Sequence, residues 1–320
     1  MTTQPKTQVL SIGEALIDRV SRPGTDTAEF VGGSILNVAV GLAQLGHDST
    51  LAAWWGPDER GNRLAEHCKQ QGVRTVPGVD GAQRTTLAEA TLDEQGRATY
   101  EFDILWDVPP ISNSREYGHL HTGSMAATIA PGADKVLRAV KEMSLSSTIS
   151  YDPNIRPAIM ESPSLVRDRI EQIVRFADVV KASDEDLQWL YPDTPVEEVM
   201  RRWLREGVSI MITTRGPWGA YVMLKGERDM LVIDPLDVEL ADTVGAGDSF
   251  MAGLLSALLD TGLLGSSDAK TRLRSARWSD VTSALHIATI TSGLTVSHNG
   301  AFAPSREDVD EVIAAHPELS

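Results

Sequence analysis

The sequence predicts an α/β protein in which helices cover both faces of a mostly parallel sheet, giving three layers. From residue 117 onward, short apolar runs that suit strands alternate with longer segments whose apolar residues recur at helical spacing. A β-hairpin pattern at 86–104 lies outside that alternation and predicts a small second sheet. Because 320 residues can bury a large core, we expect one domain, residues 1–320, with the small sheet as an appendage.

The N-terminal part begins with a buried strand at Gln8–Ile12, and Asp18 is a polar residue exposed where the following apolar run finishes. Gly32 and Gly33 then break the chain before a helix at 35–45, with Asn37 in its first turn. The glycine pair allows two interpretations. It is either a plain strand-to-helix turn or a close backbone approach to a ligand, for which Asn37 supplies a donor and an acceptor.

The next segments are a strand at 49–55, a helix ending at Gln71 and an extended stretch at 73–76. The hairpin follows, and between Thr85 and Asp107 it carries six acidic residues against a single basic residue, Arg97. We expect about 18–31 and 85–106 to form a small sheet, a lid, beside the main body.

The second half should complete the sheet and its two helical layers. Helices are predicted at 131–143, 164–176, 183–190 (opened by a capping serine), 195–206, from about 271, at 283–294 and at 305–315. Strands are predicted from Tyr117 and at 147–151, 178–180, 209–213 and 220–224. Ligands of such sheets bind at the carboxyl ends of the strands. The residues expected to converge there are Asp18, Gly123, Asn154, Lys181, Thr214 and Gly245.

A glycine turn at 242–250 leads directly into a buried helix. Small residues at the start of a helix leave its first amides approachable, and with the helix dipole they make an anion site that suits phosphate. Asp248 lies in the first turn. It either offsets the dipole or accepts a proton from an attacking hydroxyl.

Composition narrows the class of partner. A net charge of −16 argues against nucleic acid and anionic membrane surfaces as partners. Cys68 is the only cysteine, which excludes an intrachain disulfide and suits a reducing compartment. The first seven residues lack a signal-peptide core, and no apolar run approaches the roughly 20 residues that cross a bilayer. We expect a cytoplasmic protein.

Two segments carry a family resemblance. Residues 242–250 (DTVGAGDSF) and 32–39 (GGSILNVA) resemble the two signatures of the PfkB (ribokinase-like) family of carbohydrate kinases. The resemblance implies a ribokinase-like three-layer sandwich with a β-sheet lid, and a sugar kinase that uses ATP with Mg²⁺. It implies that Asp248 is the catalytic base and that the amides of Gly245, Ala246 and Gly247 hold the transferring phosphoryl group.

The resemblance also suggests where the nucleotide binds. The family's magnesium-linked motif N-x-x-E is replaced by residues 183–186 (SDED), so Asp186 is expected only as an outer-shell carboxylate, and an ordinary helix start is the alternative. Lys181 is a candidate phosphate contact. A monovalent cation such as K⁺ often lies beside the family's anion hole, but its ligands are not assigned. Two groups of residues are candidates for binding the nucleotide. The loop residues Thr214, Gly216 and Gly219 could instead form only a hairpin turn. His286 and Thr289 lie on a predicted helix, where the histidine could simply be packed.

Within the family, residues 13–18 and 152–156 look most like fructokinases, although 2-keto-3-deoxygluconate kinases share several of these features. Asp18 suits a neutral sugar, because a carboxylate can accept two hydroxyl hydrogens. Arg156 is a candidate sugar contact that could instead pair a sugar acid, bind nucleotide phosphates or be solvated. The sequence leaves three more protein classes open: a ribokinase, a nucleoside kinase and a non-catalytic sugar- or nucleotide-binding regulator. The expected sugar-binding residues are Asp18, Gly32, Gly33, Asn37, Tyr100, Phe102, Gly123 and Arg156.

The lid should cover the sugar and exclude water. Its sheet is unclosed and carries apolar side chains such as Phe30, Tyr100 and Phe102. Such an edge and surface also predict association of two chains through the lid.

Overall fold

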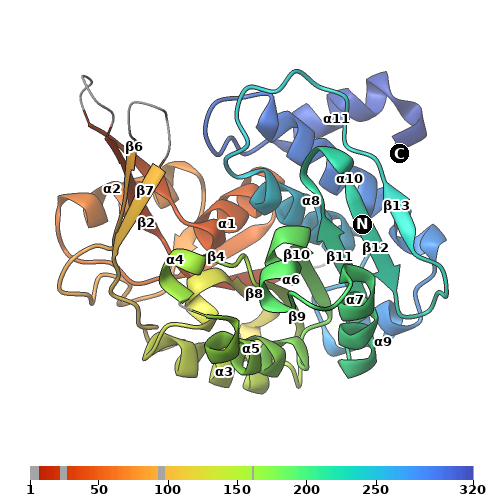
Figure 1. Ribbon diagram of the computed structural model, residues 1–320, viewed down its shortest axis with the longest axis horizontal. Coiled ribbons are helices and arrows are strands. Elements are labelled where there is room, and N and C mark those ends of the chain that lie inside the picture. Colours follow the sequence, from red (N-terminus) through yellow and green to blue (C-terminus); the bar gives the residue numbers. More distant parts are fainter. Residues whose placement is uncertain (1–6, 22–26, 93–97, 161, 320) are drawn as a thin grey trace, which may run out of the picture.

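The computed structural model describes residues 7–21, 27–92, 98–160 and 162–319, although the side chains at 90–101 lie outside that description. Two sheets organise this part of the chain (Figure 1). The larger is the predicted, mostly parallel sheet covered by helices, and the smaller is the predicted lid.

In the described residues the main sheet has nine strands in the order β13-β12-β11-β10-β9-β8-β1-β4-β5. Neighbouring strands are parallel except in the pairs β11–β12 and β12–β13 at one edge. The short edge strand β13 was not predicted. The bounds are β1 Gln8–Ile12, β4 Asp48–Ala52, β5 Arg74–Thr75, β8 Tyr117–Gly123, β9 Thr148–Asp152, β10 Val179–Ser183, β11 Ile210–Thr214, β12 Ala220–Leu224 and β13 Leu231–Ile233.

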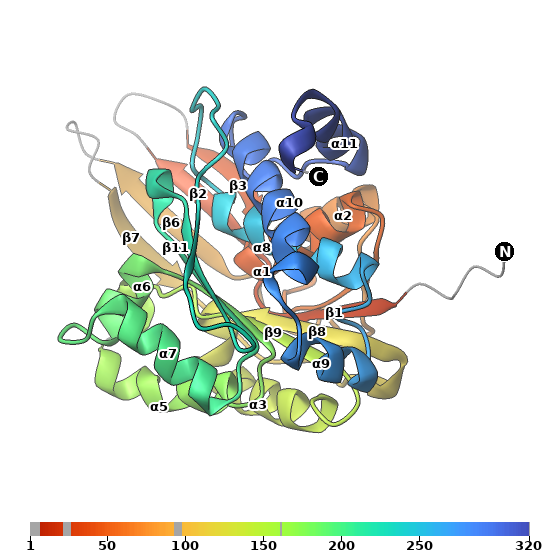
Figure 2. The same cartoon turned by 90° about the vertical axis from the view of Figure 1, so that its right-hand side faces the viewer.

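Helices cover both faces of this sheet. Figure 2 shows α1, α8, α9 and α10 on one side and α3, α5 and α7 on the other. Successive strand residues point to opposite faces, so that Val179 packs in one apolar cluster and Val180 in another. The helices are α1 Ser34–Gln44, α2 Glu59–Gln70, α3 Gly132–Met143, α4 Pro157–Met160, α5 Pro163–Val174, α6 Asp184–Leu190, α7 Val196–Glu206, α8 Ala246–Asp260, α9 Ser267–Arg274, α10 Trp278–Val296 and α11 Arg306–Ala315.

Capping side chains mark two of the correctly predicted helix starts, whereas the start of α9 was misplaced although Ser266 caps it. The Ser183 side chain accepts a hydrogen bond from the amide of Asp186 at the start of α6. Ser305 caps α11 in the same way. Helix α9 begins four residues before the predicted start at about 271, because only Ala269 and Leu273 are buried on it and its periodicity is weak.

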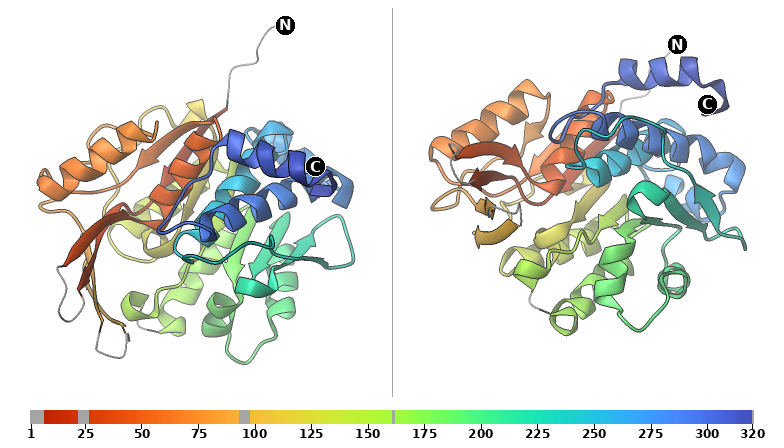
Figure 3. Two further views of the ribbon diagram at one scale, coloured as in Figure 1. Left: turned by 90° about the horizontal axis from the view of Figure 1, so that it is seen from above. Right: turned by 45° about the horizontal axis from the view of Figure 1, so that its top comes forward.

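The lid is a four-stranded sheet in the order β3-β2-β6-β7. Strands β2 and β6 pair in parallel, and the outer pairs are antiparallel. The sheet extends away from the main body (Figure 3, left). Its strands are β2 Leu16–Ser21, β3 Ala28–Gly32, β6 Leu87–Leu92 and β7 Ala98–Asp103, which confirms the predicted second sheet.

Two strand-end predictions were wrong. Asp18 lies inside lid strand β2, opposite Phe30 and Ala88, because the apolar run at Leu16 leaves the main sheet for the lid. Lys181 lies inside β10 rather than after it. Its side chain is buried in an ion pair, which lets a lysine occupy a sheet interior.

No helix within the described ranges combines the length and apolarity needed to span a bilayer.

Candidate active site

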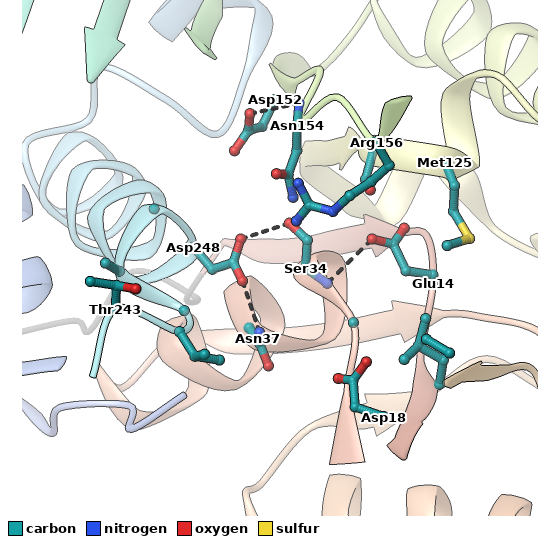
Figure 4. A pocket seen from close by; sticks show the side chains of 18 of the residues that line it. Glu14, Asp18, Ser34, Asn37, Met125, Asp152, Asn154, Arg156, Thr243 and Asp248 are labelled. Atoms are coloured by element: carbon teal, nitrogen blue, oxygen red, sulfur yellow. Dashed lines mark hydrogen bonds between the residues drawn. The ribbon is translucent and has the colours of Figure 1, made fainter. Parts of the chain in front are cut away.

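A cavity of about 360 Å³ lies between the lid and the carboxyl ends of the main strands. The lid contributes Asp18 and Phe102, and the start of α1 contributes Gly33 and Asn37. The opposite wall is the segment 243–248 at the start of α8. Figure 4 shows the side chains of Asp18, Asn37 and Asp248 converging from separate elements beside Asp152 and Asn154 at the end of β9, as expected at the strand ends of a parallel sheet.

Residues 245–248 at the start of α8 line the cavity, and the amide of Ala246 donates to the carbonyl of Thr243 over 3.3 Å. Gly245 is the N-cap residue and has a left-handed φ of 78°, and a Cβ there would lie 2.8 Å from the Cβ of Ala301. The Asp242 carboxylate fixes the preceding loop by accepting hydrogen bonds from the amides of Val244 and Gly300. The first amides of a helix have no partner within it and carry its positive dipole end. This wall can therefore bind an anion.

Asp248 is partly buried at the anion-binding wall and held from both sides. Its Oδ1 accepts a hydrogen bond of 2.7 Å from the Ser34 hydroxyl, and its Oδ2 accepts one of 2.8 Å from the Asn37 side-chain amide. Burial raises the pKa of Asp248, while these two bonds and the charges of Lys181 and Arg156 lower it in part. The arrangement fixes a carboxylate in a cavity that also contains an anion site.

The glycine pair before α1 is needed for close packing. Gly33 has a φ of 119°, and a Cβ there would lie 2.5 Å from the carbonyl oxygen of Glu14. A Cβ on Gly32 would lie 1.9 Å from Oδ2 of Asp18. The protein's own atoms therefore leave no room for a side chain at either glycine. Gly33 also lines the cavity.

Two carboxylates with raised pKa values line the cavity. Burial raises the pKa of Glu14 to about 7 and that of Asp18 to about 6. The Arg156 guanidinium lowers both pKa values in part. Arg156 donates one hydrogen bond, to the carbonyl of Ile155, among the described residues. Most of its donors are left for a ligand.

Lys181 forms a buried ion pair with Asp152, with 2.8 Å between Nζ and Oδ2. Burial works to lower the pKa of Lys181, but the Asp152 carboxylate and the charges of Asp248 and Asp186 raise it overall. A Cβ on Gly247 would lie 3.2 Å from this ammonium. A cation therefore lies beside the amides of α8.

The comparisons with known proteins agree with this geometry. Residues 6–308 match the family described as pfkB family carbohydrate kinase. A fructokinase of Rhizobium leguminosarum bv. trifolii is 31% identical over 269 residues, which cover 80% of this chain and 81% of the relative. The chain belongs to the pfkB family of carbohydrate kinases. It is a sugar kinase, and two of the predictions, the family and the class of enzyme, are confirmed.

Solved structures share the fold of this pfkB kinase. Fructokinase from Xylella fastidiosa with bound ATP superposes with a TM-score of 0.83 at 21% identity, covering 98% of this chain and 100% of the other. A double mutant of fructokinase from Vibrio cholerae O395, bound to fructose, ADP and potassium ion, gives a TM-score of 0.77 at 22% identity over 96% and 99% of the two chains. The predicted ribokinase-like architecture is confirmed.

The predicted nucleotide-side loop of the kinase is a β-hairpin turn. Thr214 ends β11 and pairs with Ala220 at the start of the antiparallel strand β12. Gly216 and Gly219 both have positive φ values in the turn, and a Cβ on Gly219 would lie 1.9 Å from the carbonyl oxygen of Ile233. The structure therefore shows the hairpin turn, and contact with the nucleotide stays a prediction.

The predicted adenine contacts of the kinase lie on α10. The Thr289 hydroxyl donates to the carbonyl of Leu285 within the helix. Nδ1 of His286 is buried without a hydrogen-bond partner in the described part of the chain. Neither residue lines the cavity around Asp248, and their role stays a prediction.

Both carboxylate oxygens of Asp186, the predicted metal-linked residue, accept hydrogen bonds from backbone amides. Oδ1 accepts from the amide of Ile155 at 2.7 Å, and Oδ2 accepts from that of Ser183 at 2.8 Å. Across the described ranges, no cluster of three or more His, Cys, Asp or Glu side chains could hold a metal ion. The structure shows Asp186 as a capping residue at an ordinary helix start, and its metal role stays a prediction.

Three further predicted sugar contacts differ in position. Phe102 lines the cavity, whereas the side chain of Tyr100 lies outside the described residues. Gly123 ends β8 against the backbone of Asp152, where a Cβ would lie 2.0 Å from the carbonyl oxygen. The residues that follow it, Ser124 and Met125, line the cavity instead.

Sequence reasoning missed Ser34 and Glu14, which both line the cavity. Ser34 directly follows the glycine pair and lies three residues before Asn37, so helical spacing places the two on one face. Glu14 follows the end of strand β1, where the strand-end rule applies. Both signals were present in the sequence.

Proposed function

We propose that this kinase transfers a phosphoryl group from ATP to a primary hydroxyl of a small neutral sugar, with fructose as the leading candidate. The observation that carries the proposal is the position of Asp248. Its carboxylate is fixed by Ser34 and Asn37 beside the start of α8, in a cavity that also contains Asp18. A base and an anion site in one cavity are the parts that phosphoryl transfer to an alcohol requires.

In the proposed reaction Asp248 accepts the proton of the attacking sugar hydroxyl. The amides of Gly245, Ala246 and Gly247, together with the α8 dipole, stabilise the negative charge of the phosphoryl group while it is transferred. The Lys181 ammonium adds positive charge next to Gly247. When bound with ATP, Mg²⁺ neutralises phosphate charge. The described residues offer it no cluster of three or more side chains, so the proposal has it enter with the nucleotide.

The sugar is proposed to lie between the lid and α1. Asp18 would accept hydroxyl hydrogens, Gly33 and Asn37 would contact the sugar from the start of α1, and Phe102 would cover it. The 31% identical relative is itself a fructokinase, and the Vibrio cholerae structure contains fructose, which supports this substrate.

A specific observation favours a second candidate, 2-keto-3-deoxygluconate. Arg156 lines the cavity and donates a single hydrogen bond, to Ile155, within the described structure. Its remaining donors suit the carboxylate of a sugar acid, because a guanidinium binds a carboxylate with two parallel hydrogen bonds.

The kinase is further proposed to act as one domain, residues 1–320, whose lid, about 18–31 and 85–106, closes over the sugar. Phe30 on the edge strand β3 is 55% exposed, which supports pairing of two lids in a homodimer; a monomer in light scattering would refute it. A potassium requirement is proposed from the potassium-bound relative.

The test is ADP release from ATP measured with fructose, ribose, adenosine, 2-keto-3-deoxygluconate and fructose phosphates, with the phosphorylated position identified by NMR. We expect the highest kcat/KM with fructose and a product phosphorylated at a primary hydroxyl. Highest activity with the sugar acid would select the second candidate. Absence of turnover with every neutral sugar would overturn the proposal.

A further inference from the structure

Glu14 is a cavity residue with an unused, buried acceptor. It follows strand β1, its side chain is 5% exposed, and it lines the cavity together with Asp18 and Asp248. Its Oε1 accepts a hydrogen bond of 3.2 Å from the amide of Ser34, as Figure 4 shows. Its Oε2 has no hydrogen-bond partner among the described residues. Buried polar atoms in folded proteins nearly always have a partner, so this oxygen requires an explanation.

A capping role at α1 explains only half of the side chain. The bond from Ser34 satisfies one amide at the helix N-terminus. A neutral glutamine would make the same bond through its carbonyl oxygen without the cost of burying a charge. The second carboxylate oxygen therefore has a use other than holding the helix.

The surroundings of Glu14 define the group that this oxygen can bind. The Ser124 hydroxyl, the Arg156 guanidinium and the Asp248 carboxylate all act on its pKa and so lie near it. Above the pKa of about 7 that burial gives Glu14, its carboxylate is ionised, and its oxygens accept hydrogen bonds and donate none. A sugar hydroxyl satisfies this oxygen, whereas an anionic ligand group next to Glu14, Asp18 and Asp248 meets like charge.

We propose that Glu14 determines specificity for neutral sugars. Its free Oε2 accepts a hydrogen bond from a hydroxyl of the sugar, and its negative charge disfavours a sugar acid in the same position. Glu14 opposes Arg156 in this respect, because the guanidinium alone would favour the acid. The inference rests on the proposed function for the presence of a sugar in the cavity, and it holds for any neutral sugar that the enzyme phosphorylates.

The test is Glu14→Gln, which keeps the acceptor for Ser34 and places an NH₂ donor where the free oxygen was. At a pH well above 7, where Glu14 of the wild type is ionised, we would measure kcat and KM for the best neutral sugar, the inhibition constant of 2-keto-3-deoxygluconate and the KM for ATP in the wild type and the variant. We expect a sugar KM raised about tenfold, the loss typical for a hydrogen bond to a charged group. Binding of the sugar acid should stay equal or tighten, and the KM for ATP should not change.

Two variants separate recognition from structure. Glu171→Gln changes a glutamate of similar burial on α5, which accepts from Tyr191 and Arg202 away from the cavity, and it should leave the sugar KM unchanged. Glu14→Ala loses the helix bond as well and should add a fall in melting temperature.

Three results of the measurement bear on the proposal. A wild-type sugar KM in Glu14→Gln would overturn it, because a capping side chain needs no charge. Equal weakening of the neutral sugar and the sugar acid would also overturn it, since distortion of α1 gives that result. A wild-type enzyme without activity on any neutral sugar would instead refute the proposed function, so the two failures are distinguishable.

Discussion

Replacing Ser34 with alanine should raise the pKa of the proposed base, Asp248, without altering its position. The Ser34 hydroxyl donates one of the two hydrogen bonds that Asp248 receives, over 2.7 Å, and the Asn37 amide donates the other. Alanine is the best helix former and Ser34 is the first residue of α1, so the helix should persist. The backbone bond from residue 34 to Glu14 also remains.

The size of the effect follows from the charge of the acceptor. A hydrogen bond to an ionised group contributes about 1.5–3 kcal/mol, and about 1.4 kcal/mol corresponds to a tenfold change. This bond lowers the pKa of Asp248 against the effect of burial, so removing it raises that pKa. We expect kcat/KM to fall by about tenfold or more on the acidic side of the pH profile. The loss should shrink as pH rises, because the base becomes ionised in both proteins.

The assay is the pH dependence of kcat/KM for the sugar, with Lys181 and Arg156, the other groups that act on the pKa of Asp248, left intact. Ser49→Ala is the matched control. Ser49 is also buried and donates a bond of 2.8 Å, to the carbonyl of Ala39 in α1, but it does not line the cavity. The control should leave the profile in place. A loss of activity in Ser34→Ala that is equal at every pH, or no loss, would refute the reasoning.

Three further predictions concern the packing of charged and strained residues. Lys181→Met leaves Asp152 as a buried carboxylate without its ion-pair partner, and urea unfolding should show a loss of about 3–5 kcal/mol. Gly33→Ala places a Cβ 2.5 Å from a backbone oxygen at a φ of 119°, so its melting temperature should fall by the equivalent of roughly 1–3 kcal/mol. Burial raises the pKa of Glu14 from 4.5 to about 7, so the folded protein binds this proton more tightly than the unfolded chain does. The contribution of this proton to the free energy of unfolding is complete below the ordinary pKa and is lost as pH rises through about 7. Above neutral pH, the free energy of unfolding of Glu14→Gln in urea should therefore be roughly 3 kcal/mol larger than that of the wild type.

Each of these has a clear contrary result. Unchanged urea midpoints for Lys181→Met would mean that the ion pair with Asp152 is not needed in the folded state. A wild-type melting temperature for Gly33→Ala would mean that the start of α1 relaxes freely. A stability difference between Glu14→Gln and the wild type that does not vary with pH would mean that Glu14 titrates normally.

Local signals predicted most of the main sheet and its helices. The capping serines Ser183 and Ser305 fixed two helix starts, because a capping side chain bonds within three residues of itself. The edge strand β13, Leu231–Ile233, was missed although residues 230–233 (MLVI) form a short apolar run in the sequence. Asp18 lies in the lid, as its assignment to 18–31 predicted, but inside a strand rather than at the end of one. Nothing local shows that this strand already begins at Leu16, since it pairs with residues about 70 positions away.

Only the part of the candidate site that is formed by neighbouring residues was predictable from the sequence. The glycine turn at 242–250 and the carboxylate of Asp248 form a local pattern with its own chemistry. The hydrogen-bond partners of that carboxylate do not belong to any local pattern, because Ser34 lies 214 positions from Asp248 in the sequence. The role of Glu14 depends on which of its oxygens finds a partner, and only coordinates show that.

The most direct test of the account is the activity of Asp248→Asn. Asparagine keeps the shape of the side chain and can still accept from Ser34, but it cannot take the proton of the sugar hydroxyl. With the sugar that the wild type prefers, we predict that kcat falls by about 10²–10⁴, while the dissociation constant of ATP measured by calorimetry is unchanged. A variant that retains near-normal kcat would contradict the assignment of Asp248 as the base.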